Sequence, residues 1–270
     1  MKRGVLVIAL GALLSAGCQT VPEAQQDQIQ AAREILEAGD MIVALPADAQ
    51  TRAKAHTDLA AAYYELGNLA VALEETRIAL RANPNYARAH NVRGLVHMDL
   101  RENAEAEQSF KRGLQLAPQD ADLNHNYGWF LCQTNRADES VEWFLKAIKN
   151  PLYRTPARSY AAAGHCTERS DPKEAAEFYE RALRLEPNNP SVLLSFAGLQ
   201  YRQGQLHEAR ALVSRYYKLV KDPTAESLWL AHRIEHKLGD RMAANQYATE
   251  LRRRYANSPQ YQALQRGQYE

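Results

Sequence analysis

Two pairs of side chains have residue types and a spacing that could support chemistry. Cys132 and Cys166 are 34 residues apart. Two thiols in an oxidising compartment favour one disulfide, with two buried free thiols as the alternative. His232 and His236 are four residues apart, a spacing that could place two imidazole ligands on one helix face. No third ligand is evident near the two histidines, so we predict no metal site. We also predict a Cys132–Cys166 disulfide, no cofactor and no catalytic residues.

The start of the chain has the three parts of a secretory signal. Lys2 and Arg3 form a charged start, an apolar run of about ten residues follows, and small residues come before Cys18. Such a run is too short to span a bilayer as a permanent helix, which needs about 20 residues. We therefore expect residues 1–17 to be a signal peptide that is removed after export.

The sequence "LSAGC", from Leu14 to Cys18, resembles the lipobox of bacterial lipoproteins, although Ser15 stands where that family prefers Leu. The resemblance implies that Cys18 is lipidated, and several acyl chains hold a protein firmly on a membrane. It also implies handling by the lipoprotein-export machinery. Gln19 follows the cysteine in place of the Asp that retains such proteins at the inner membrane. We expect an outer-membrane anchor facing the periplasm, with residues 18–24 as a tether.

Composition narrows the classes of partner. The chain has 33 Lys and Arg and 32 Asp and Glu, so the loss of Lys2 and Arg3 would leave a net charge near −1. A nucleic-acid-binding protein would show a basic surplus. We therefore predict no nucleic-acid partner.

An internal period near 34 residues organises the chain. Small residues recur at this spacing in three series, and a proline follows several of the predicted helices. One such series is Ala60, Gly94, Gly128, Ala163 and Ala197, and another is Ala72, Ala106, Ser140, Ala175, Ala209 and Ala244. Apolar residues between them recur at helical intervals, and no run alternates as a strand does. The pattern predicts an all-α chain of helical hairpins packed closely through their small residues.

These repeats resemble the tetratricopeptide (TPR) family, whose 34-residue unit is a helix–turn–helix. Leu59, Ala60, Tyr63, Gly67 and Pro84 occupy signature positions of the best copy. The resemblance implies a superhelical solenoid with a concave groove for a peptide. We expect an N-terminal helix and connection at 25–52, six repeats within 53–258 and a C-terminal tail at 259–270. The repeat ranges are 53–86, 87–120, 121–154, 156–189, 190–223 and 225–258; in the sixth, His232 stands where a small residue belongs.

In the TPR family, fixed positions of each first helix face the groove. By this resemblance the predicted groove residues are Tyr64, Asn91, Leu95, Met98, His125 and Trp129. Some of these side chains could instead fill the gap between neighbouring helices. An apolar and aromatic groove would suit an apolar partner segment, and we place its anchors in the first repeats.

A lipobox, six repeats and paired cysteines in the third and fourth repeats together resemble the PilF/PilW family of type IV pilus lipoproteins, the pilotins. The resemblance implies a protein that binds secretin subunits and promotes their outer-membrane localisation and multimerisation. One alternative is another outer-membrane TPR lipoprotein, such as a periplasmic protease adaptor or a β-barrel assembly accessory. A second is a periplasmic enzyme whose activity would depend on His232 or His236.

Overall fold

The computed structural model describes residues 48–269, and all regular structure among them is helical. Twelve helices form six hairpins, and a thirteenth follows them. Their bounds are α2 (Ala49–Glu65), α3 (Leu69–Ala82), α4 (Ala87–Asp99), α5 (Asn103–Leu116), α6 (Ala121–Gln133), α7 (Ala137–Lys149), α8 (Pro156–Thr167), α9 (Pro172–Leu185), α10 (Pro190–Arg202), α11 (Leu206–Leu219), α12 (Ala225–Leu238), α13 (Arg241–Tyr255) and α14 (Pro259–Gln265).

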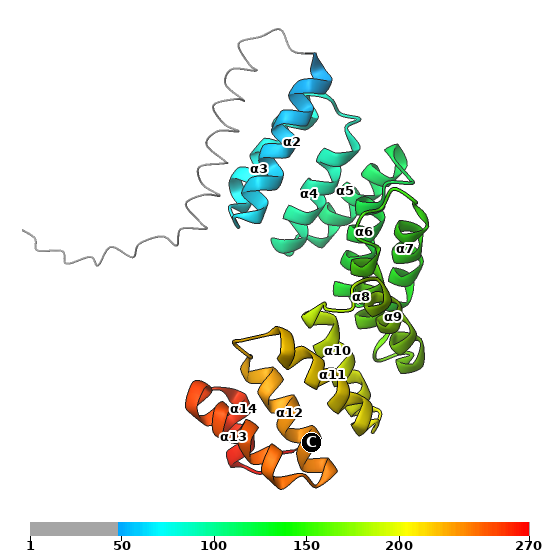
Figure 1. The fold of residues 1–270 in the computed structure, drawn as a ribbon. Helices are drawn as coiled ribbons and strands as arrows, with labels where there is room; N and C mark the ends of the chain where they lie inside the picture. The colour runs from blue at the N-terminus through cyan, green and yellow to red at the C-terminus, as the bar shows by residue number, and fades with distance from the viewer. Residues whose placement is uncertain (1–47, 270) are drawn as a thin grey trace, which may run out of the picture. The chain divides into compact units, whose positions relative to one another are not determined.

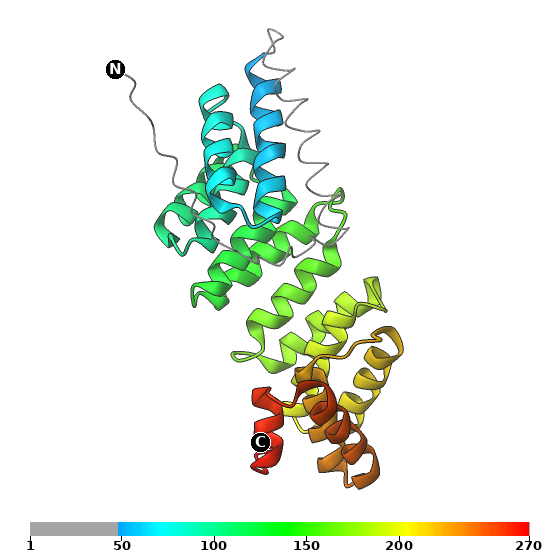
Figure 2. The same ribbon diagram turned by 90° about the vertical axis from the view of Figure 1, so that its left-hand side faces the viewer.

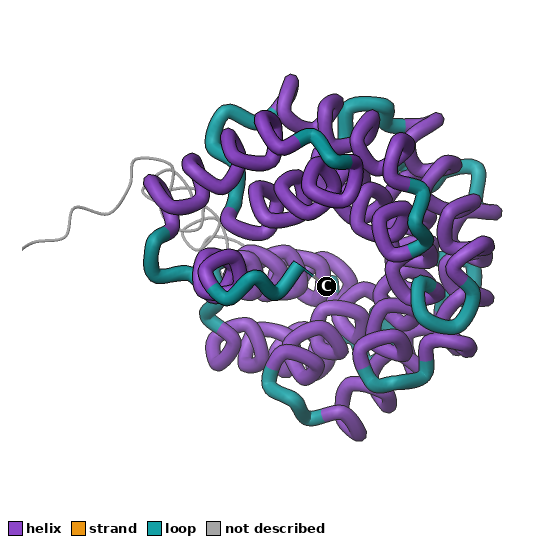
Figure 3. Tube along the Cα trace, turned by 90° about the horizontal axis from the view of Figure 1, so that it is seen from below, coloured by secondary structure: helices purple, strands orange, loops and turns teal. Residues whose placement is uncertain are grey.

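The hairpins follow one another in chain order along a curved path (Figures 1 and 2). In Figure 1 the second helices α5, α7 and α9 lie on the outer side of the curve, and their partners α4, α6 and α8 lie on the inner side. Figure 3 shows the same path from below, with helices joined only by loops. The prediction of an all-α TPR solenoid is confirmed for the described residues.

Local sequence signals explain where the helices begin and end. Asp48 accepts a hydrogen bond from the Thr51 amide at 2.8 Å and so caps the start of α2. Gly67, in the turn between α2 and α3, has φ +74°, a conformation that glycine adopts without strain. One period and two periods later, Arg101 and Asn135 take the same left-handed conformation, with φ +64° and +62°. The turn geometry is therefore repeated even where glycine is absent.

Within the second and third hairpins, a glycine on the first helix faces an aromatic ring on the second. A Cβ atom at Gly94 would lie 2.7 Å from the Phe110 ring, and one at Gly128 would lie 3.0 Å from the Phe144 ring. Both rings are fully buried. The small residues at repeat spacing therefore let the paired helices approach until backbone meets ring.

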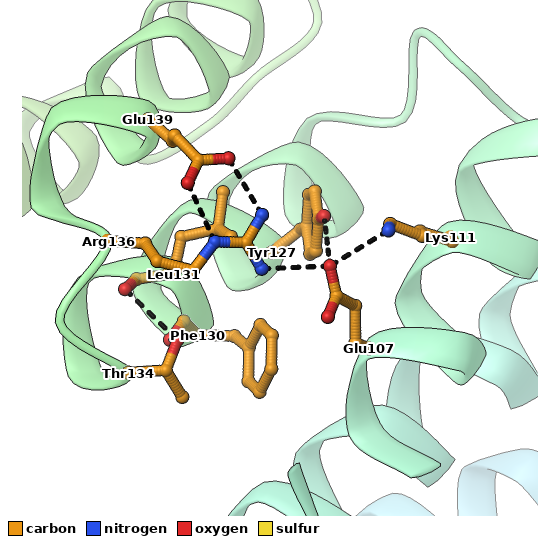
Figure 4. A network of polar contacts seen from close by, with 8 residues as sticks. All are labelled: Glu107, Lys111, Tyr127, Phe130, Leu131, Thr134, Arg136 and Glu139. Carbon is orange, nitrogen blue, oxygen red and sulfur yellow. Dashed lines mark hydrogen bonds and ion pairs between the residues drawn. The ribbon is translucent and has the colours of Figure 1, made fainter. Parts of the chain in front are cut away.

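A polar network joins the second hairpin to the third. Figure 4 shows Arg136 between the carboxylates of Glu107 and Glu139. Its guanidinium donates to Glu107 Oε1 at 2.9 Å and to both Glu139 oxygens at 2.7 Å. Lys111 and the Tyr127 hydroxyl also reach Glu107 Oε1, at 2.9 and 3.2 Å. These contacts lower the pKa of Glu107 to about 2, chiefly through the hydrogen bond from Arg136.

The structure differs from the expected domain boundaries at both ends of the solenoid. Helix α2 begins at Ala49, four residues before the expected repeat, because Asp48 supplies the cap. The expected tail at 259–270 contains α14, which packs against α12 and α13. The signal peptide, Cys18, the tether and the N-terminal helix expected from residue 25 onward lie outside the described residues.

Candidate functional site: a pocket on the inner face

The inner face of the solenoid carries a pocket where the third, fourth and fifth hairpins meet. Its volume is about 340 Å³. Helices α6, α8 and α10 supply most of its walls, and α9 contributes one tyrosine. The lining residues are His125, Trp129, Arg158, Ala161, Ala162, His165, Tyr179, Ser191, Val192 and Ser195.

Two aromatic rings form one wall of this pocket. Trp129 of α6 and His165 of α8 have ring centroids 5.8 Å apart. The Trp129 side chain is half-buried and His165 is exposed, so both rings present a surface to a bound segment. Such rings provide contact area at a low cost in conformational entropy.

A disulfide lies directly beside this wall. The structure joins Cys132 of α6 to Cys166 of α8, with Cα atoms 5.7 Å apart. Cys132 is one helical turn beyond Trp129, and Cys166 follows His165 in the sequence. The covalent link therefore holds the two aromatic side chains in register across the third and fourth hairpins.

Polar bonds at one-repeat spacing connect the inner helices. The Asn126 amide donates to Asn91 Oδ1 at 3.0 Å, and His125 Nδ1 is hydrogen-bonded to Ser159 Oγ at 2.8 Å. His125 is 3% exposed. Burial, assisted by the charge of Arg158, lowers the pKa of His125 to about 3, so its imidazole is neutral at physiological pH. Close helix packing excludes water from these polar groups, and the bonds between helices supply the hydrogen-bond partners that water would otherwise provide.

Arg158 provides the positive charge of the pocket. Its side chain is exposed, and its guanidinium donates to Asn126 Oδ1 at 3.4 Å. No carboxylate is among the residues that line the pocket, and Ser191 and Ser195 add hydroxyl groups. This arrangement suits an extended partner segment that carries an apolar or aromatic side chain and, beside it, an acidic or carbonyl group.

The structure divides the six predicted groove residues into three groups. His125 and Trp129 line the pocket, although His125 is otherwise buried between helices. Asn91 is 8% exposed and hydrogen-bonded to Asn126, so it joins helices instead of facing an open groove. The half-buried Tyr64, Leu95 and Met98 pack against the clusters of the first three hairpins.

The hydroxyl of Tyr64 has a partner within the chain. Burial, and then a hydrogen bond to the Asp99 carboxylate, raise the pKa of Tyr64 to about 12. The pocket therefore lies further along the solenoid than the anchors expected in the first repeats. Sequence reasoning missed Arg158, His165 and Ser195. Asn91, His125 and Ser159 are equivalent positions, one repeat apart, and Arg158 is next to Ser159. Extending the groove positions by one more repeat could therefore have indicated the fourth hairpin.

The histidine pair of α12 packs with other aromatic rings. His232 stacks on Trp229 with centroids 5.5 Å apart, and His236 lies 5.9 Å from His232. Among residues 48–269, no group of three or more His, Cys, Asp or Glu side chains could hold a metal ion. None of the helices described is long and apolar enough to span a membrane.

Comparisons with known proteins agree with this architecture. The tetratricopeptide repeat family matches residues 87–222. The type IV pilus assembly protein PilF of Pseudomonas aeruginosa is 31% identical over 215 residues, which cover 78% of this chain and 84% of that protein. The crystal structure of PilW, a widely conserved type IV pilus biogenesis factor, matches with a TM-score of 0.75 at 30% identity, covering 78% of this chain and 97% of PilW.

A structure of P. aeruginosa PilF matches with a TM-score of 0.73 at 29% identity, over 81% of this chain and 99% of that one. The expected family resemblance is thereby confirmed. The chain belongs to the PilF/PilW family of TPR proteins of type IV pilus biogenesis.

Proposed function

We propose that this protein is an outer-membrane pilotin, which binds secretin subunits and promotes their localisation and multimerisation for pilus biogenesis. The observation that carries the proposal is the inner-face pocket, because it offers an aromatic wall and an exposed Arg158 with no lining carboxylate. TPR proteins mediate protein–protein interaction, and membership of a pilus biogenesis family favours a pilus component as the partner.

In this proposal the lipid and the pocket have separate tasks. The N-terminal sequence leads us to expect acyl chains on Cys18. These chains would hold the protein on the periplasmic face of the outer membrane. The pocket would hold an extended secretin segment, with an aromatic or apolar side chain against Trp129 and an acidic group beside Arg158. Binding would cover apolar secretin surface that promotes aggregation before insertion.

The test is to delete the gene, complement it with variants and blot membrane fractions for the detergent-resistant secretin multimer. We expect deletion to abolish the multimer or strand secretin at the inner membrane. We expect Trp129→Ala and Arg158→Glu each to weaken binding of the secretin periplasmic domain by about ten-fold or more. Arg184→Glu is the matched control, because Arg184 is exposed on α9 and lies outside the pocket.

Two other results would change the assignment. Loss of binding with Tyr64→Ala and Leu95→Ala, but not with the pocket variants, would place the contact on the first two hairpins. Unchanged multimers in the deletion strain would overturn the pilotin function and favour a protease adaptor or a β-barrel assembly accessory.

A further inference from the structure

The segment after the sixth hairpin folds back onto the inner face of that hairpin. Helix α14 packs against α12 and α13, and the chain then runs to Tyr269. The Tyr201 hydroxyl of α10 donates a hydrogen bond to the Tyr269 carbonyl at 3.0 Å. The Tyr269 ring lies with its centroid 4.3 Å from His236 and 6.1 Å from Trp229. A short piece of the chain is therefore seated on α10 and α12 as a bound peptide would be.

This seat leaves a buried polar atom without a partner. His232 is 4% exposed, and its Nδ1 is hydrogen-bonded to the Ala244 carbonyl at 2.9 Å. A carbonyl only accepts, so Nδ1 carries the proton. Burial lowers the pKa of His232, which favours the neutral form. Nε2 then presents a lone pair, and that atom is buried and has no hydrogen-bond partner. Leaving a buried acceptor unsatisfied costs stability.

An open cleft runs beside the segment. Its volume is about 760 Å³, and it lies between α12, α13 and α14. It is bounded by His232 and His236 on α12 and by Tyr261, Leu264 and Tyr269 from the C-terminal segment. A partner segment could therefore approach His232 and His236 from this open side.

The sequence of α12 points to the same place. His232 stands at a repeat position that holds Ala60, Gly94, Gly128, Ala163 or Ala197 in the earlier hairpins. A small residue there would leave room for close helix packing, whereas the His232 side chain reaches across the hairpin to the Ala244 carbonyl of α13. Departures from a local packing rule are expected mainly at functional sites.

Resting on the proposed secretin-binding function, we propose that the inner surface formed by Tyr201, Trp229, His232 and His236 is a second docking surface for an extended partner segment, now occupied by Gly267–Tyr269. We call these four residues the C-terminal docking surface. The partner segment carries an aromatic side chain in the place of Tyr269 and a backbone carbonyl that accepts from Tyr201. It also carries a hydrogen-bond donor that reaches His232 Nε2.

The rim of this surface adds a charge preference. The Arg233 guanidinium lies 4.7 Å and Lys237 Nζ lies 4.6 Å from the centroid of the Tyr201 ring. An acidic residue beside the aromatic residue of the partner would therefore be attracted to the rim. The segment Gly267–Tyr269 itself is followed in the sequence by Glu270.

The experiment measures binding of a fluorescently labelled synthetic peptide, with the sequence of residues 257–270, to the full chain. Tyr269→Ala removes the ring that holds the internal segment, so the surface becomes available to the added peptide. We expect this variant to bind the peptide at least ten-fold more tightly than the unaltered chain. Gln268→Ala is the matched control, because Gln268 is the neighbouring residue and is exposed to solvent.

Three further measurements make the result specific. Adding Tyr201→Phe to Tyr269→Ala should weaken peptide binding about five-fold, because one hydrogen bond is lost. The same peptide with alanine at the position of Tyr269, and with Tyr261 kept, should not bind. Tyr269→Leu, which keeps an apolar side chain, should release the surface partially if Tyr269→Ala proves poorly folded by circular dichroism.

Equal peptide binding by the Tyr269→Ala variant and the unaltered chain, or no binding by either, would overturn the docking surface. The Tyr269→Ala variant should also bind the secretin periplasmic domain more tightly. If the peptide results hold while secretin binding is unchanged, the surface stands and secretin is not its partner. Loss of secretin binding in the pocket variants alone concerns the proposed function and not this surface.

Discussion

At the scale of single residues, the absence of one methyl group decides how closely the helices of a hairpin can pack. Glycine inside a helix costs about 1 kcal/mol relative to alanine, and Gly94 is in the interior of α4. The cost is tolerated because a Cβ atom there would lie 2.7 Å from Phe110. Gly198 in α10 is different, because its Cβ would make only an ordinary van der Waals contact, with the end of the Arg202 side chain at 3.5 Å.

The two glycines should therefore respond in opposite directions to the same substitution. Gly94→Ala should lower the free energy of unfolding by about 1–3 kcal/mol, since the Phe110 ring must shift in a packed core. Gly198→Ala should raise it by about 0.5–1 kcal/mol through helix propensity. Urea titration of both variants measures the difference. Equal stability of the two would mean that the glycine–aromatic contact does not control the packing.

At the scale of helices, the junction between the second and third hairpins depends on charge as well as on apolar packing. Glu107 of α5 accepts hydrogen bonds from Arg136, the residue directly before α7, and from Tyr127 of α6 (Figure 4). The Glu107 side chain is 26% exposed, so solvent screens this network less than a fully exposed ion pair.

Glu107→Gln should lower the free energy of unfolding by about 1–2 kcal/mol at pH 7. The sign with pH follows from the lowered pKa. The contribution is present above the ordinary pKa near 4.5 and is lost as the pH falls toward the folded-state pKa of about 2. Unfolding of the variant and the unaltered chain should therefore converge between about pH 5 and pH 2.5.

Glu180→Gln is the control for this experiment, because its ion pair with Arg184 is long, at 3.8 Å, and both side chains are more than half exposed. That variant should change stability by less than about 0.5 kcal/mol at every pH. A constant difference between Glu107→Gln and the unaltered chain across this range would exclude the carboxylate charge as the cause.

At the scale of the whole solenoid, one covalent link holds the region where the repeat pattern is interrupted. The stretch from Pro151 to Pro156 contains two prolines and separates α7 from α8. The Cys132–Cys166 disulfide bridges the same two hairpins on the inner face, beside the pocket. Each hairpin in a solenoid contacts only its neighbours, so loosening one junction also separates the surfaces on either side of it.

Replacing both cysteines by serine should lower the free energy of unfolding by roughly 4 kcal/mol in the chain-entropy model for a loop of this length. It should also weaken partner binding at the pocket, because Trp129 and His165 would no longer be held together. Thermal unfolding and binding assays with the unaltered chain under reducing conditions should reproduce both changes. The stability of the serine variant should not change with reductant. If the serine variant were as stable as the oxidised unaltered chain, the disulfide would not be what stabilises this junction.

The sequence by itself determined the family, the helical class and the hairpin repeat. These features are local, because the residues that specify them act within one repeat or between adjacent repeats. Examples are the small residues at repeat spacing, Gly67 in a turn and the Asn83–Pro84 pair at a helix end, which all act through backbone sterics. The start of α14 also had a local signal, since Ser258 caps it and Pro259 is its first residue. That signal was missed because the segment lies beyond the last repeat.

Only the tertiary structure decided which inner residues are open to a partner. Asn91 and Trp129 both occupy positions that face the groove in the repeat pattern, yet Asn91 is covered by Asn126 of the next hairpin. Trp129 remains part of the pocket because His165 and Arg158 border it from α8. Exposure on a concave surface depends on side chains one repeat away and, at Trp229 and His236, on a segment that folds back. A repeat pattern specifies the direction in which a side chain points, whereas its neighbours in space determine what it meets.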